Sequence, residues 1–97
     1  MLKNLSISLP VVLSQHGKKV VVYSPALDIS TAGKNLAEAR KRFAEMVPLF
    51  IEEIVEAGTA HDVLTELGWK KEAKQKSWLP PKVLNTEAIG VRVPAFA

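Results

Sequence analysis

The chain has 97 residues, of which 47% are apolar and 24% charged, and these values fit one ordered globular domain. It contains no cysteine, which excludes disulfides, thiolate zinc sites and thiol nucleophiles, and its net charge of +3 is low for a nucleic-acid-binding domain. Because serines and a proline interrupt the N-terminal apolar stretch and no segment approaches the roughly 20 apolar residues of a membrane span, we expect a soluble, cytoplasmic protein with no membrane partner.

Residues 1–33 predict three strands in an antiparallel meander. Apolar side chains alternate over residues 5–13, which is typical of a half-buried strand, and Pro10 places that strand at a sheet edge or at a bulge. A short turn containing a glycine follows. The β-branched run over 19–24 predicts the second strand, and residues 27–31 predict the third.

Two helices are expected next. Asn35, with Glu38 three residues later, has the pattern of a helix N-cap, and apolar residues then recur at helical spacing through a long helix over 35–57. Pro48 lies inside this helix, and because the apolar phase continues through it, one kinked helix is preferred to two. A shorter helix is expected over 59–68.

The remaining residues predict a linker over 69–85 and a last strand over 86–94. In that strand the apolar side chains of Ile89, Val91 and Val93 alternate with smaller or polar residues. The sequence therefore predicts a single α+β domain over residues 1–97, in the order strand-strand-strand-helix-helix-strand. It would form a two-layer sandwich, with the meander and the last strand packed on the long helix.

The sequence contains no complete catalytic or metal-binding constellation. Ser24 and Ser30 are possible nucleophiles whose only possible histidine bases are His16 and His61, and both histidines fit ordinary surface positions. The two histidines share no spacing that would place them together as metal ligands. We therefore expect no catalytic residues, no metal, no cofactor and no enzymatic activity.

Three groups of residues are candidates for binding instead. The first group lies on the outward side of the long helix and consists of Glu45, Glu52, Glu53 and Glu56. Exposure to solvent explains these glutamates, but they could also bind a basic partner. Trp69 and Trp78 either cover the core or anchor a partner chain. The third group is either a solvated linker or a phosphate-binding strip: Lys70, Lys71, Lys74 and Lys76.

The segment Val21–Leu27, followed by Thr31–Ala39, resembles the HicB antitoxin family. That family typically has an aromatic-Ser-Pro-x-Leu turn and then a Gly-x-(Thr/Ser)-x-x-Glu-Ala helix entry; here Asn35 takes the Thr/Ser position. The resemblance covers about residues 11–57. It departs from the family pattern at Asp28-Ile29-Ser30, where Pro-Gly-Cys is common, and the sequence after the helix leaves no room for the family's DNA-binding domain.

The resemblance implies a truncated ribonuclease-H-like sheet without catalytic acids, and three functions follow as hypotheses. The first is a HicB-like antitoxin, or a stand-alone relative, that occludes a small HicA-like ribonuclease toxin. The second is a nucleic-acid-binding accessory domain that uses the 70–76 lysine segment, with Trp69 or Trp78 stacking on bases. The third is a self-associating domain, and family members are expected to form homo-oligomers.

Overall fold

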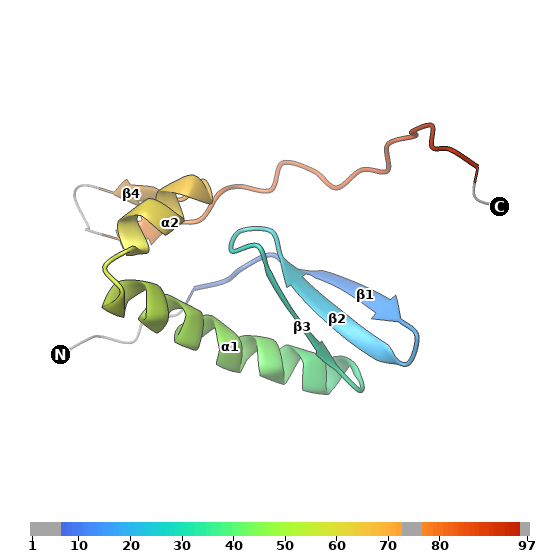
Figure 1. Cartoon of the computed structure of the whole chain (residues 1–97), viewed down its shortest axis with the longest axis horizontal. Helices are drawn as coiled ribbons and strands as arrows, with labels where there is room; N and C mark the ends of the chain where they lie inside the picture. Colours follow the sequence, from blue (N-terminus) through green and yellow to red (C-terminus); the bar gives the residue numbers. More distant parts are fainter. Residues whose placement is uncertain (1–6, 73–76, 96–97) are drawn as a thin grey trace.

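The computed structural model describes residues 7–72 and 77–95 and confirms an α+β fold (Figure 1). Its elements in chain order are β1 (Val12–His16), β2 (Lys19–Ser24), β3 (Ile29–Gly33), α1 (Leu36–Glu56), α2 (Ala60–Glu66), β4 (Lys70–Glu72) and β5 (Ser77–Leu79). The first three strands form one antiparallel sheet in the order β1-β2-β3, and β4 pairs with β5 in a second, small sheet. Helix α1 packs against β3 and β2.

Short local signals set the register of the meander. His16 pairs with Lys19 across a two-residue turn in which Gly17 has a φ of 60°, a conformation that glycine adopts without steric cost. The first strand begins only at Val12, so Pro10 precedes the strand and does not occupy an edge or bulge position within it. The part of the predicted strand that covers residues 5 and 6 lies outside the described residues.

The third strand begins two residues later than predicted, because the turn after β2 is longer than expected. Ser24 closes this turn: its carbonyl accepts a hydrogen bond from the Asp28 amide at 2.8 Å, and its buried hydroxyl lies 3.4 Å from the Leu27 amide nitrogen. Asp28 has a φ of 53°, in the left-handed region that aspartate tolerates better than most residues. The chain becomes extended again at Ile29.

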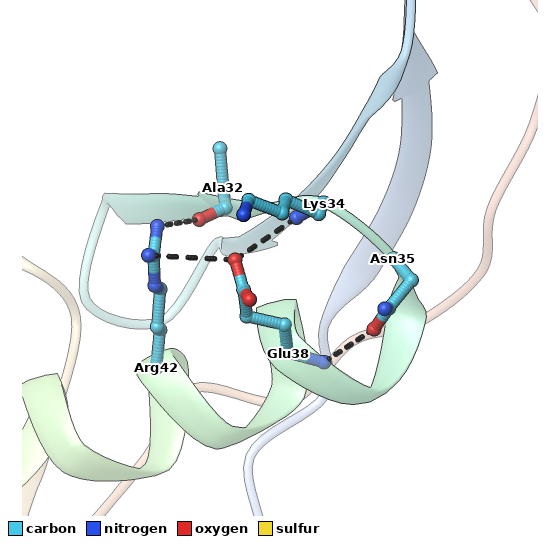
Figure 2. A network of polar contacts seen from close by, with 5 residues as sticks. All are labelled: Ala32, Lys34, Asn35, Glu38 and Arg42. Atoms are coloured by element: carbon cyan, nitrogen blue, oxygen red, sulfur yellow. Dashed lines mark hydrogen bonds and ion pairs between the residues drawn. The ribbon is translucent and has the colours of Figure 1, made fainter.

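The start of α1 is held by a polar network (Figure 2). The Glu38 amide donates to the Asn35 side chain at 2.8 Å, which confirms Asn35 as the N-cap, and the Glu38 carboxylate accepts from the Lys34 amide at 3.1 Å. Arg42 forms an ion pair with Glu38 at 3.4 Å and donates to the Ala32 carbonyl of β3 at 3.0 Å. The network ties the end of the sheet to the first turns of the helix.

Helix α1 continues through Pro48 without a break, so it is one helix and not two. The second helix is shorter than predicted and covers residues 60–66. Thr59 is its N-cap residue, but its side chain makes no cap hydrogen bond. After this helix the Trp69 amide donates to the Leu64 carbonyl at 2.9 Å, and the chain turns back toward the sheet.

The predicted C-terminal part is wrong in two respects. Within the expected linker 69–85, Lys70–Glu72 pairs with Ser77–Leu79 as a short hairpin, so part of this segment is sheet. Residues 86–94, expected as the last strand, have no regular secondary structure and do not pack on α1. Alternation indicates that a segment is able to form a strand, but a strand also needs a partner edge, and in this structure 86–94 has none.

The core lies where four segments meet, at the end of α1 away from its N-cap. Its buried members are Ala26, Leu27, Ile54, Leu64 and Trp69, from the β2-β3 turn, α1, α2 and the start of the small sheet. Half-buried side chains of α1, α2 and β5 pack around this cluster. The described residues leave no buried side-chain nitrogen or oxygen without a hydrogen-bond partner.

Candidate functional site

The outward face of α1 carries the four glutamates that the sequence singled out. Glu45, Glu52, Glu53 and Glu56 are all exposed, and their spacing places them on one side of the helix. On the opposite side, half-buried α1 residues such as Val47 pack against the core cluster, and Ile54 is buried within it. The core therefore fixes the rotation of the helix and leaves the four carboxylates facing solvent.

The charges on this face oppose the helix dipole. The partial negative charge at a helix C-terminus disfavours acidic side chains there by about 0.3–1 kcal/mol each, yet the last turn of α1 contains Glu53 and Glu56 and no basic residue. In the described part of the chain Arg42 forms an ion pair with Glu38, and His61 Nδ1 lies 3.8 Å from the Asp62 carboxylate; neither contact neutralises this face. An approaching cationic surface would relieve both the dipole conflict and the mutual repulsion of the carboxylates.

The sequence reasoning did not single out Leu49, which lies among these glutamates. Its side chain is 64% exposed, and it occupies the position four residues after Glu45 and four before Glu53. The helical phase of α1 could have identified it, because an apolar residue on the outward side stands out from the polar pattern. The outward surface of α1 formed by Glu45, Leu49, Glu52, Glu53 and Glu56 is called the acidic face below.

Trp69 belongs to the core and is only 5% exposed, so its indole is not available to anchor a partner in this structure. Its Nε1 donates to the Ala26 carbonyl at 2.8 Å, across 43 positions of sequence. Buried tryptophan needs such a partner for its ring N–H, and the β2-β3 turn supplies it. Trp69 is therefore a structural residue.

Trp78 and the lysines lie around the small sheet. Trp78 is half-buried, packs against the core cluster, and meets His61 edge to face with ring centroids 5.4 Å apart. Lys70 and Lys71 are exposed on β4. Lys74 and Lys76 lie outside the described residues.

The groups considered for catalysis do not converge. Ser14, not a predicted candidate, has its hydroxyl 2.9 Å from Nε2 of His16, in an exposed pair on β1. His61 lies on α2, and Figure 1 shows α2 and the β1-β2 turn at opposite ends of the folded body. Ser24 is fully buried and contacts the turn backbone, whereas Ser30 is exposed. In residues 7–72 and 77–95 no group of three or more potential metal ligands comes together.

Tyr23, which lies outside the acidic face, has a perturbed pKa. The Tyr23 hydroxyl donates to the Asp28 carboxylate at 2.8 Å. This hydrogen bond, together with desolvation and the negative charge of Asp28, raises the pKa of Tyr23 above its ordinary value of 10.0. The tyrosine therefore stays a neutral donor across the physiological range.

The architecture defines this chain as a small α+β domain with an antiparallel meander covered by one long helix. Comparison with protein-family models, curated proteins and solved structures found no match. In the part of the chain that the structure covers, neither helix has the length and apolar content needed to cross a membrane.

Proposed function

We propose that this chain is a HicB-like antitoxin, or a stand-alone relative, that binds a small, basic, HicA-like ribonuclease toxin and neutralises it by occlusion. The acidic face of α1 is the observation that carries the proposal. It presents four carboxylates and one exposed leucine on a helix that the core holds in a fixed orientation. A toxin that binds RNA needs a cationic surface, and covering that surface blocks RNA without any chemistry on the antitoxin.

The residues that carry the family resemblance support the proposal through their structural roles. Ser24 closes the turn after β2, and Asn35 and Glu38 cap α1. Gly33 lies so close to α1 that a Cβ there would be 2.5 Å from the Ala39 amide nitrogen, which explains a glycine before the helix. These roles account for the spacing of the motif by which the chain resembles the HicB family.

The charge balance also bears on the proposal. The chain as a whole has a net charge of +3, which disfavours long-range attraction to a basic partner. Between Phe43 and Glu56, however, the helix has four glutamates and no lysine or arginine. Within a Debye length of about 8 Å at physiological salt this local charge decides the interaction.

The proposal expects an adjacent reading frame to encode the basic toxin, and it is tested by titrating the purified chain with that product. We expect a stable complex that inhibits the toxin's ribonuclease activity. The variant E52K/E56K should bind at least about tenfold more weakly, since two attractive contacts become repulsive. The matched control D62K/E66K makes the same charge change at exposed positions of α2 and should retain the affinity.

Absence of a complex at low salt, or equal affinity of E52K/E56K and the parent chain, would reject the proposal. Steep, salt-sensitive binding of single-stranded or duplex nucleic acid would instead favour the accessory-domain hypothesis. That hypothesis keeps the lysine segment 70–76 and takes Trp78 as the stacking residue, because Trp69 is buried.

A further inference from the structure

The outer edge of β1 is open. Among residues 7–72 and 77–95, β2 pairs with one side of β1 and no strand pairs with the other side. The strand also exposes large apolar side chains on both faces: Val12 is 49% and Leu13 42% accessible. The opposite edge of the sheet differs, because the Arg42 side chain of α1 donates a hydrogen bond to the Ala32 carbonyl of β3. An additional strand would therefore join this sheet at β1.

A shallow hollow lies beside that edge, on the side of the sheet that α1 covers. It has a volume of about 290 Å³ and is lined by Leu13, Ser14 and Gln15 of β1, Val20 of β2 and Leu36 of α1. Leu36 is itself 36% exposed. Apolar side chains from an added strand would enter this hollow and extend the contact between the sheet and the helix.

The C-terminal segment, residues 82–95, has the pattern of a strand without a partner. Every residue in it is exposed, and the side chains of Ile89, Val91 and Val93 are 78%, 76% and 65% accessible. These three alternate with Gly90 and Arg92, so an extended backbone presents them along one side. A soluble domain rarely leaves such a row uncovered.

The geometry directs this segment away from its own sheet. Pro81 lies against Gly68, where a Cβ would be 3.5 Å from the proline ring, and the Pro80-Pro81 pair stiffens the exit. Figure 1 shows the segment leaving β5 as an extended trace that runs past the sheet without joining it. The radius of gyration, 16.3 Å, exceeds the roughly 13 Å of a compact chain of this length.

We propose that residues 87–93 of one copy pair with the outer edge of β1 in a second copy, and that the exchange is reciprocal. Ile89, Val91 and Val93 then enter the hollow beside Leu13 and Leu36 of the partner copy. Each chain carries both the donor strand and the acceptor edge, so two copies related by a two-fold axis can each pair their donor strand with the other's β1 edge. The resulting dimer covers both open β1 edges and both apolar rows. This dimer does not depend on the presence of a toxin.

The first test measures the mass of the full chain in solution by sedimentation. We expect a dimer for the parent chain and a dimer for Leu84→Asp, which alters a 93%-exposed residue of the same segment outside the exchanged strand. Val91→Asp should weaken the dimer at least about 100-fold, because each of the two exchanges would bury an unpaired carboxylate. The Val91 side chain makes no core contact, so circular dichroism should show an unchanged fold.

The second test identifies the chain that supplies the strand. The chain has no cysteine, so Leu13→Cys in one copy can be combined with Ile89→Cys, Val91→Cys or Val93→Cys, each in turn, in another copy. Co-refolding and mild oxidation should yield a disulfide between two different chains for at least one pair. The same procedure with Leu84→Cys should yield none.

Three results would overturn the exchange. One is a monomeric parent chain at about 100 μM, a concentration at which even a weak dimer is populated. The second is an equally stable dimer of Val91→Asp. The third concerns a chain that carries both Leu13→Cys and Val91→Cys: a disulfide that closes within that single chain would show that the segment completes its own sheet.

Discussion

Tyr23 and Asp28 show how one turn determines the behaviour of a single side chain. Asp28 takes a left-handed backbone conformation, with a φ of 53°, and its carboxylate accepts the Tyr23 hydroxyl at 2.8 Å. Because the carboxylate stabilises the neutral phenol and repels the phenolate, the pKa of Tyr23 is raised. The stabilisation is present at neutral pH and is lost as the pH rises above 10.0 through the raised pKa of the folded chain.

Asp28→Gly should lower the pKa of Tyr23 toward 10.0, since it removes both the hydrogen-bond acceptor and the charge. Glycine suits the left-handed conformation, so the turn itself should persist. Tyr23 is the single tyrosine of the chain, and an absorbance titration of the phenolate therefore reports on it alone. The remote Asp62→Asn should leave the titration unchanged. A Tyr23 pKa that does not move in Asp28→Gly would show that this hydrogen bond is absent in solution.

At the scale of elements, β3 and α1 meet at a contact that only glycine allows. A Cβ on Gly33 would lie 2.5 Å from the Ala39 amide nitrogen and 2.9 Å from its Cα, both backbone atoms that cannot move without displacing the helix. Ala39 is completely buried at this contact. The approach of α1 to the sheet, and with it the direction of the acidic face, therefore depends on the absence of a side chain at position 33.

Gly33→Ala should destabilise the protein by about 1–3 kcal/mol or more, because the added methyl forces the first turns of α1 away from β3. Urea denaturation followed by circular dichroism measures this loss. Lys41→Ala is the control, since it leaves the same methyl side chain at an exposed position of α1, and it should change the free energy of unfolding by less than about 0.5 kcal/mol. If the two variants were equally stable, α1 would not pack this closely on the sheet.

The elements that the sequence predicted well are those set by neighbours in the chain. The Gly17 turn, the β-branched run of β2 and the Asn35 cap are local signals, and the structure contains all three. The strand β4 begins Lys70-Lys71, which has no β-branched residue, and only its pairing with β5 makes it a strand. For residues 86–94 the error was the opposite. The alternating side chains predicted a strand, but in the structure no neighbouring strand pairs with this segment.

The residues of the candidate site also divide into those that a local pattern places and those that depend on distant contacts. Helical phase was enough to place Glu45, Glu52, Glu53 and Glu56 outward, and Leu49 could have been added by the same reasoning. Trp69 could not be assigned between core and surface from the sequence. Its burial depends on the Ala26 carbonyl, 43 positions away, and no local pattern reports a contact at that separation.

At the scale of the whole molecule, Trp69 joins two parts of the chain. The meander and α1 form one part, and α2 with the β4-β5 hairpin forms the other. The core cluster spans both, since Ala26 and Leu27 come from the meander, Ile54 from α1, and Leu64 and Trp69 from the second part. The indole hydrogen bond to Ala26 directly connects the small sheet to the turn between β2 and β3.

Trp69→Phe tests whether this connection makes the molecule unfold as one unit. The substitution keeps an aromatic ring in the core but leaves the buried Ala26 carbonyl without its donor, which should cost about 1–3 kcal/mol before any loss of packing. Trp78→Phe removes an indole that is only half-buried, and it should cost less than about 1 kcal/mol.

The parent chain should unfold in one transition seen equally by circular dichroism and by amide hydrogen exchange in α1 and α2. In Trp69→Phe the amides of α2 should exchange before those of α1, because the second part has lost its anchor on the first. Parallel exchange of both helices in the variant, with no loss of stability, would show that the two parts are held together by other contacts.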